Sequence, residues 1–247
     1  MNKLNRLEWT PELVSKFWDN ISRSRLTEYS FSKQAGKSLI IAIKHLLRLE
    51  DKILDFGAGD GHLIQLLCER GYSVSGYEPS EERRNNLKTH LDKLTTFNGF
   101  VDYSSKNMFD VVVMAEVIEH ILDINLDSTL EKLATFTKQD GYLIVTTPNN
   151  EDLELAMSYC PVSDLFFHRW QHVRSFTALS LAELLDKYGF EEIVTHEVEF
   201  NNPLYTPGDD VWGSKGENIP SYIKQIRKNI KTNMGGDKNL LYIGRKI

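Results

Sequence analysis

The chain has 247 residues and a net charge of −6, long enough for one large α/β domain or two small ones. Because it is acidic overall, it lacks a general basic surface for holding a long nucleic acid, while a local basic patch remains open. Cys68 and Cys160 lie far apart in the sequence and predict neither a disulfide framework nor a zinc site. The sequence shows no signal peptide and no run of about eighteen apolar residues, so we expect a cytoplasmic protein without membrane insertion.

The first 50 residues predict an N-terminal cap of two helices. Thr10 followed by Pro11 is typical of a helix start, because threonine caps the first turn and proline fits the first helical position. Apolar residues at helical spacing predict a second helix over about residues 32–49. We expect the aromatic side chains between residues 9 and 18 to pack within this cap rather than to contact a ligand.

A strand, a glycine turn and a helix are predicted over residues 52–67. The apolar strand leads into Asp55, and glycines follow at three alternate positions, namely Gly57, Gly59 and Gly61. A dinucleotide fingerprint has its third glycine one residue later, where this sequence has His62, so pyrophosphate binding is the less favoured interpretation. Such a turn brings bare backbone and a helix N-terminus up to a ligand.

A second strand, over residues 72–78, ends in Glu78 and is followed by Pro79. A carboxylate at this strand end can accept hydrogen bonds from both ribose hydroxyls of an adenosine. Asp55, the alternate glycines and Glu78 together resemble the cofactor site of the class I S-adenosylmethionine-dependent methyltransferases. The alternative is an ordinary strand, loop and helix with a glutamate on the surface. The resemblance implies a cofactor site made of Asp55, Gly57, Ala58, Gly59, Gly61, Glu78, Pro79, Phe100 and Glu116.

The residue that contacts the adenine is left open by the sequence. A charged helix is predicted over about residues 81–94, followed by a third strand over residues 94–101. Methyltransferases of this class usually have an acidic residue after that strand, whereas this chain reads Phe-Asn-Gly-Phe-Val-Asp over residues 97–102. Either Phe100 stacks on the adenine or Asp102 accepts a hydrogen bond from its amino group.

The remaining chain alternates strands and helices, which is the signature of a doubly wound parallel sheet. The almost continuous apolar run over residues 109–116 is typical of a central strand buried on both faces. It delivers Glu116 to the edge where open α/β sheets bind their ligands. Further helices are predicted over residues 126–138 and 178–188, and further strands over residues 142–147, 190–200 and 239–247.

We therefore expect a single α/β methyltransferase domain over residues 1–247, with a Rossmann-like, doubly wound sheet of seven strands. Residues 1–50 form the cap in this prediction, and residues 51–200 and 239–247 form the core. The resemblance implies that strand seven is antiparallel. Insertions are expected at residues 151–176, before the next helix, and at residues 201–238, before the last strand, where substrate specificity is usually built.

Glu116, Glu119 and His120 are spaced so that a helical turn after the fourth strand points all three side chains the same way. Two carboxylates and an imidazole are reasonable ligands for a divalent ion such as Mg²⁺ or Mn²⁺. A fourth ligand is needed, and the candidates are His168 and His172.

The pattern Glu-x-x-Glu-His with a later histidine resembles two metal-dependent groups, the O-methyltransferases of ubiquinone biosynthesis and the small-RNA 3′-terminal ribose 2′-O-methyltransferases. The resemblance implies His172, five residues before Thr177, as the fourth ligand, with His168 behind it or in contact with substrate. Many methyltransferases of this fold have the same pattern without a metal; there the glutamate orients the cofactor, and His120 acts as a base or packs on the sheet. Both alternatives stay open.

We predict that the chain transfers a methyl group from S-adenosylmethionine to a hydroxyl oxygen of a sugar-bearing or other small-molecule acceptor. Glu119, His120 and His172 are the predicted catalytic residues. A metal would favour an acceptor with two adjacent hydroxyls, such as a sugar, a nucleoside or a catechol. Transfer to nitrogen or carbon without a metal, and a non-catalytic S-adenosylmethionine-binding scaffold, are the alternatives. The oligomeric state is not predicted.

Overall fold

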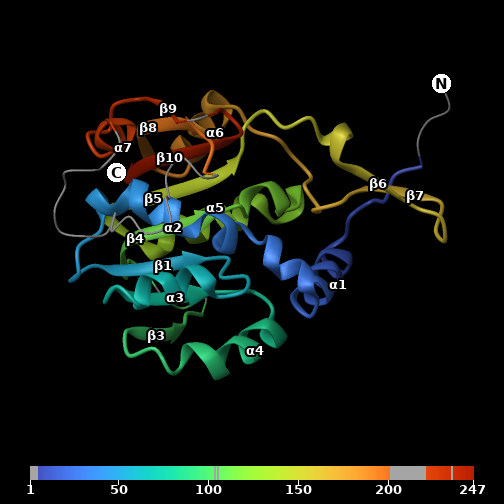
Figure 1. Cartoon of the computed structure of the whole chain (residues 1–247), viewed down its shortest axis with the longest axis horizontal. Coiled ribbons are helices and arrows are strands. Elements are labelled where there is room, and N and C mark those ends of the chain that lie inside the picture. The colour runs from blue at the N-terminus through green and yellow to red at the C-terminus, as the bar shows by residue number, and fades with distance from the viewer. Residues whose placement is uncertain (1–4, 103, 105, 201–220, 235) are drawn as a thin grey trace.

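The computed structural model describes residues 5–102, 104, 106–200, 221–234 and 236–247, and its central feature is a mixed sheet with helices on both faces (Figure 1). Within these residues the strand order is β3-β2-β1-β4-β5-β10-β8-β9. In that order the strands are Phe97–Phe100, Ser73–Tyr77, Lys52–Phe56, Phe109–Ala115, Thr137–Pro148, Asn239–Lys246, Phe190–Val198 and Asn233–Met234.

Strand directions in the sheet follow the predicted doubly wound scheme. Neighbouring strands from β1 to β5 pair in parallel, whereas β10 runs antiparallel to both β5 and β8. The antiparallel strand seven is therefore confirmed. The two-residue strand β9 pairs in parallel with β8 and adds an edge strand that the sequence pattern did not indicate. It belongs to the expected insertion at 201–238, of which residues 201–220 and 235 lie outside the described residues.

Alternate residues of the central strands fill two apolar layers. Ile53 and Val111 belong to one layer, and their neighbours Leu54 and Val112 belong to the other. Successive strand residues point to opposite faces, so the uninterrupted apolar runs cover both. The first layer includes residues of α2 (Phe31–Ile43), α3 (His62–Cys68), α4 (Glu81–Leu91) and α7 (Ser221–Ile226), and the second includes residues of α5 (Asp123–Phe136) and α6 (Ala178–Asp186). No helix in the described part of the chain is long and apolar enough to cross a membrane.

The N-terminal cap consists of α1 (Pro11–Ser22), the 3-10 turn η1 (Arg25–Tyr29) and α2. Thr10 caps α1 as predicted, because its Oγ1 accepts a hydrogen bond from the backbone N–H of Leu13 at 3.3 Å. The second helix ends earlier than predicted, at residue 43, and a 3-10 turn, η2 (Lys44–Leu46), follows it. An apolar pattern alone does not distinguish the end of an α-helix from the tighter turn that closes it.

The helix before β8 begins as predicted, at Ala178, and ends at Asp186, two residues earlier than predicted. Thr177 and Ser180 form a capping box, in which each side chain accepts a hydrogen bond from the other residue's backbone N–H. Gly189 follows the helix with a φ of 81°, the left-handed conformation in which glycine is favoured.

The connection between α5 and β5 differs from the prediction. α5 spans residues 123–136, and β5 begins directly after it, at Thr137. Asp140 and Gly141, between the predicted helix and the predicted strand, lie inside β5, where Asp140 has a φ of 65° and the pairing with β4 shifts register. These two residues therefore belong to a bulge in a longer strand.

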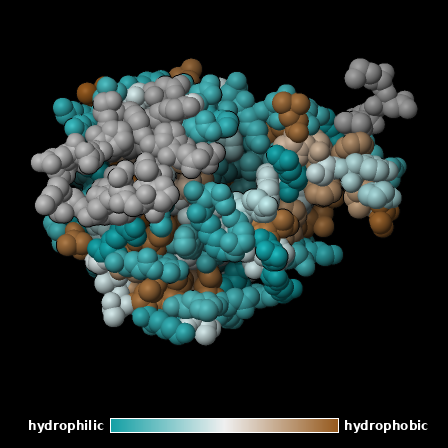
Figure 2. All heavy atoms as spheres, in the orientation of Figure 1, coloured by the Kyte–Doolittle hydropathy of each residue, from teal (hydrophilic) through white to brown (hydrophobic). Residues whose placement is uncertain are grey.

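The expected insertion at residues 151–176 forms a separate hairpin. A 3-10 turn, η4 (Leu153–Ala156), leads into β6 (Met157–Cys160), which pairs with β7 (Leu165–His168). Asn5 and Leu7 hydrogen-bond to Phe166 of this hairpin through their backbones. The hairpin projects from the body of the protein beyond α1 (Figure 1), and hydrophobic residues gather over that end (Figure 2).

One buried histidine of the sheet is held in its neutral form. His196, in β8, is fully buried, and its Nδ1 accepts a hydrogen bond from Thr232 N at 3.3 Å. Burial lowers the pKa of His196 to about 4, and the charges of His45 and Lys231 lower it further. The unfolded chain binds a proton at the ordinary pKa of 6.5, so the folded state loses stability as the pH falls from 6.5 toward 4.

Replacing His196 with glutamine should remove this pH dependence. The native chain should lose stability relative to His196→Gln by at most about 1.4 kcal/mol per pH unit between pH 6.5 and 4. Urea unfolding at several pH values measures this difference, and His90→Gln, at an exposed histidine, is the control. A difference that stays constant over this pH range would contradict a neutral His196.

Candidate active site

A cavity of about 540 Å³ lies at the carboxyl ends of β1 and β4, beneath the N-terminal cap. The glycine turn after β1 contributes Asp55, Gly57, Ala58 and Gly59 to its wall. The cap contributes Trp18, Leu26 and Tyr29, and the segments after β4 and β7 contribute Glu116, Glu119, His120, Trp170 and His172. This is the edge at which open α/β sheets bind ligands, so the cavity is the candidate active site.

The glycine turn exposes backbone to the cavity. Gly57 and Ala58 both donate their N–H groups to the carbonyl of Tyr77, which holds the turn against the end of β2. Gly57 has a φ of 89°, and a Cβ there would lie 2.6 Å from a methyl group of Val117. A Cβ at Gly59 would make only an ordinary contact, 3.7 Å from the carbonyl oxygen of Gly57, but the φ of 54° means that the backbone would strain a side chain at this position.

The carboxylate of Glu78 is buried beside the glycine turn rather than in the cavity wall. Its oxygens accept hydrogen bonds from Gly59 N at 3.3 Å and from Ser80 N at 2.9 Å, and an ion pair with Arg83 measures 2.8 Å. Burial raises the pKa of Glu78, while the charge of Arg83 and these hydrogen bonds lower it in part. Glu78 therefore shapes the turn directly, and its contact with ribose stays a prediction.

Three other residues predicted to contact the cofactor do not line the cavity in the described part of the chain. Gly61 is the N-cap of α3, and Pro79 is exposed with its carbonyl accepting a hydrogen bond from Arg84. The ring of Phe100 packs over Gly76 of the neighbouring strand. Their roles in cofactor binding stay predictions.

Acidic side chains surround the turn. Burial, and then the charges of Asp60 and Glu78, raise the pKa of Asp55 to about 8. Asp60 accepts hydrogen bonds from the hydroxyls of Ser30 at 2.6 Å and Ser32 at 2.9 Å. These two serines belong to the start of α2, so the cap is tied to the turn at the cavity wall.

Glu116 lines the cavity at the end of β4 and has a left-handed backbone with a φ of 52°. Its Oε1 accepts a hydrogen bond from Asn239 Nδ2 at 3.2 Å. Burial raises the pKa of Glu116 to about 7, although hydrogen bonds from Thr146 and Asn239 oppose the shift. Glu116 is not a member of the group that gathers around Glu119.

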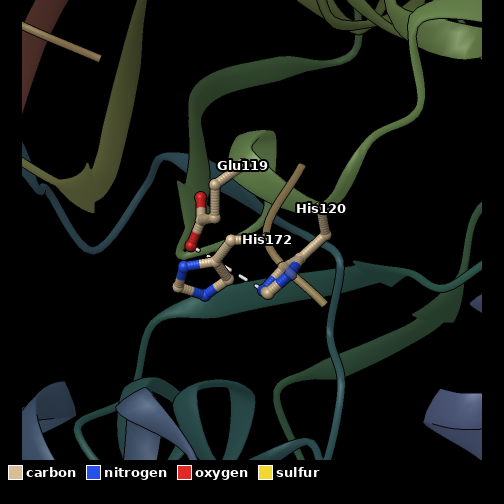
Figure 3. A group of neighbouring side chains, drawn as sticks. All are labelled: Glu119, His120 and His172. Atoms are coloured by element: carbon tan, nitrogen blue, oxygen red, sulfur yellow. Dashed lines mark ion pairs between the residues drawn. The ribbon is translucent and has the colours of Figure 1, made fainter. Parts of the chain in front are cut away.

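Glu119, His120 and His172 come together at the cavity wall (Figure 3). One candidate ligand atom from each lies within 4.8 Å of the others. Thr147 donates its hydroxyl to Glu119 Oε2 at 3.0 Å, while Glu119 Oε1 lies 3.7 Å from His120 Nε2. The 3-10 turn η3 (Ile118–His120) supplies the first two residues, and the backbone of Val173 hydrogen-bonds to Glu119 beside the third.

Burial dominates the electrostatics of this group. Burial and the charge of Glu116 raise the pKa of Glu119 well above its ordinary value. Burial, with repulsion from His172, lowers the pKa of His120 to about 3. Burial thus favours the uncharged forms of Glu119 and His120. Shifted pKa values of this kind are typical of functional sites.

Glu151 is a site residue that sequence reasoning missed. Its carboxylate pairs with His172 Nδ1 at 2.5 Å and with His168 Nε2 at 3.4 Å. Burial would raise the pKa of Glu151, but hydrogen bonds with His168 and His172 lower it to about 2. Glu151 comes three residues after the end of β5, at the ligand-binding edge of the sheet, and that position could have indicated it.

The strand order and the glycine turn are those expected of the class I S-adenosylmethionine-dependent methyltransferase fold, as the sequence predicted. Residues 22–196 match a family model described as a methyltransferase domain, and the chain belongs to that family. It is similar to two proteins named ubiquinone biosynthesis O-methyltransferase. The Pelagibacter ubique protein is 30% identical over 72% of this chain and 75% of its own length. The Bradyrhizobium diazoefficiens protein is 26% identical over 65% of this chain.

This chain spans only part of the length of the curated relatives that it matches. This chain covers 64% of the Bradyrhizobium protein, which is less than two thirds of it. Among solved structures, the fold is similar to that of Burkholderia thailandensis 1,6-didemethyltoxoflavin-N1-methyltransferase, with a TM-score of 0.61 at 17% identity. That likeness covers 97% of this chain and 91% of the other, whose crystal structure contains S-adenosylhomocysteine. At this identity it shows the fold alone.

Substitutions at the turn should weaken S-adenosylmethionine binding. Gly59→Val forces a branched side chain into a left-handed backbone, and Glu78→Ala removes an acceptor of the turn and the proposed ribose contact. Each change should raise the calorimetric Kd at least about tenfold, equal to about 1.4 kcal/mol. Glu82→Gln, at an exposed residue of α4, is the control. Unchanged affinity in both variants would overturn the cofactor site.

Proposed function

We propose that this chain is an S-adenosylmethionine-dependent O-methyltransferase for a small acceptor with two adjacent hydroxyls. The observation that carries the proposal is the group of Glu119, His120 and His172, which shares one cavity with the glycine turn. Methyl transfer to a hydroxyl needs such a group, because the oxygen must lose a proton as it attacks. The names of the ubiquinone-biosynthesis relatives also support oxygen as the acceptor atom.

The acidic turn suits the methyl donor. S-adenosylmethionine supplies a methyl group on a positively charged sulfur, which is already activated for transfer. Carboxyl groups of Asp55, Asp60 and Glu78 lie near one another around the turn, and Glu116 lines the cavity beyond it. In this proposal Glu78 holds the ribose and the backbone at Gly59 lies against the methionine end. A cationic donor favours the ionised forms of these carboxyl groups, which burial alone disfavours, so it binds beside them more strongly than its uncharged product.

The group of Glu119, His120 and His172 fits a divalent ion. Glu119 Oε1 and His120 Nδ1 are buried and have no hydrogen-bond partner among the described residues, which is costly for polar atoms. Two ligands on opposite sides of one ion lie about 4.2 Å apart, so small rotations bring atoms within 4.8 Å to bonding distance. Glu119, His120 and His172 would hold the ion, whose charge lowers the pKa of a bound hydroxyl. Two imidazoles favour Mn²⁺ over Mg²⁺, because Mg²⁺ prefers oxygen ligands.

The individual residues have distinct roles in this proposal. His120 is a weak base, because burial lowers its pKa to about 3, so its role is to bind rather than to accept a proton. His172, hydrogen-bonded to Glu151, is then the residue that accepts the proton of the acceptor if no ion is bound. Glu116, held by Asn239, is assigned to the cofactor side of the cavity.

The cavity favours a small acceptor. Its volume of about 540 Å³ lies within the range of small-ligand pockets, about 300–1,000 Å³, and it has to hold the methyl donor as well as the acceptor. Aromatic side chains of Trp18, Tyr29 and Trp170 line it and offer flat apolar surface to a ring. The net charge of −6 disfavours a long nucleic acid, so the acceptor we propose is a sugar-bearing or other small molecule.

A metal-dependent reaction makes a clear prediction. Methylation of a model catechol or nucleoside, followed by mass spectrometry, should stop in EDTA and return with Mn²⁺ more fully than with Mg²⁺. Glu119→Gln and His172→Ala should each lower kcat at least about 100-fold, because each removes a ligand or base. The Kd for S-adenosylmethionine should change by less than about twofold.

The control for these variants is Glu183→Gln, at an exposed residue of α6. Full activity in EDTA would reject the metal-dependent reaction and leave His172 as a general base that needs no ion. A product methylated on nitrogen would contradict transfer to oxygen and favour an N-methyltransferase. Binding of S-adenosylmethionine without turnover in any acceptor mixture would favour a scaffold protein instead.

A further inference from the structure

Glu151, His168 and His172 form a second cluster of potential metal ligands behind the cavity wall. His172 lines the cavity, whereas Glu151 and His168 are not among its lining residues. The rings of His168 and His172 stack with centroids 4.4 Å apart and an interplanar angle of 22°. Which nitrogen of each ring carries the proton decides whether the cluster can bind a metal.

The backbone fixes the tautomer of His168. Its Nδ1 accepts two hydrogen bonds, from Trp170 N at 3.3 Å and from His172 N at 3.1 Å. A neutral imidazole has one donor nitrogen and one acceptor nitrogen, so the proton of His168 lies on Nε2. That atom is buried and lies 3.4 Å from Glu151 Oε1. His168 therefore has no lone pair left for a metal, and the cluster is not a second metal site.

The same carboxylate acts on His172. Glu151 Oε2 lies 2.5 Å from His172 Nδ1, and a carboxylate accepts hydrogen bonds without donating any. The Nδ1 of His172 then carries a proton, and in the neutral ring Nε2 is the lone-pair nitrogen. Histidines that bind metals or accept protons commonly have their other nitrogen held by a carboxylate in this way.

We propose that Glu151 is a positioning residue that holds His172 in the Nδ1–H tautomer, while His168 Nε2 lies next to the other oxygen of the carboxylate. The inference rests on the proposed function only in giving His172 a role as ligand or base. His168 is the last residue of β7, and Arg169 N bonds to Ala156 O across the base of the hairpin. The inserted hairpin thus contributes to the active site through the tautomer of one histidine.

Nitrogen-15 NMR of histidine-labelled native protein at neutral pH, with chelator and without metal, tests this directly. Peaks are assigned with His168→Gln and His172→Gln. We expect a protonated Nδ1 and a bare Nε2 in His172, and the opposite arrangement in His168. A proton on Nε2 of His172, alone or with one on Nδ1, would overturn the proposal. This outcome does not depend on activity, so it is distinct from failure of the proposed function in EDTA.

The variant Glu151→Gln tests the cause. A glutamine replaces one carboxylate oxygen by an NH₂ donor and removes the negative charge, so it no longer selects Nδ1–H, and the ring nitrogen shifts of His172 should move toward a mixture of tautomers. Mn²⁺ affinity, measured by electron paramagnetic resonance, should fall by about 10- to 100-fold, with S-adenosylmethionine affinity unchanged. Glu154→Gln is the matched control, since Glu154 lies on the same segment but pairs with Arg6. Unchanged His172 nitrogen shifts in Glu151→Gln would refute a positioning role.

Discussion

The candidate site depends on a buried carboxylate that its neighbours satisfy only in part. Glu119 accepts a hydrogen bond from Thr147 on one oxygen, and its other oxygen has no hydrogen-bond partner among the described residues. Burying such an atom costs free energy unless a ligand or an ion pairs with it. Glu119 lines the cavity beneath the cap, so a partner can approach it there, where His120 and His172 already lie.

The cap and the inserted hairpin close this site through a short chain of contacts. Trp18 of α1 donates its indole N–H to Gln171 Oε1 at 2.8 Å, and Gln171 Nε2 donates to the carbonyl of His120 at 3.0 Å. At the other end, the serines at the start of α2 hold Asp60 of the glycine turn. Both contacts bring the N-terminal segment over the sheet edge. Excluding water there strengthens every electrostatic interaction within the cavity.

The acidic residues divide into two functional regions of the same cavity. Asp55, Asp60 and Glu78 surround the glycine turn, where a cationic ligand would relieve their mutual repulsion. Glu119 faces two imidazoles instead, and Glu151 stands behind one of them with a pKa lowered to about 2. A carboxylate in the first region attracts a charge, and one in the second orients or binds a catalytic group.

The sequence by itself determined the features that depend on residues close together along the chain. The glycine turn, the capping of α1 and α6, and the apolar central strands all follow from local conformational preferences and from side-chain alternation. Together with the motif resemblance they predicted the sheet and the methyltransferase class. The spacing of Glu119 and His120 likewise placed them together, because one 3-10 turn holds both.

The tertiary structure alone decided how distant segments meet. The pairing of β3 with β2 placed Phe100 on Gly76, the carboxylate of Glu116 bonds to Asn239 instead of joining the group around Glu119, and Glu151 lies against His172. A shift of one residue in register moves a side chain to the opposite face of a sheet. The contacts named above join segments that are remote in sequence, so they form only when the intervening loops close.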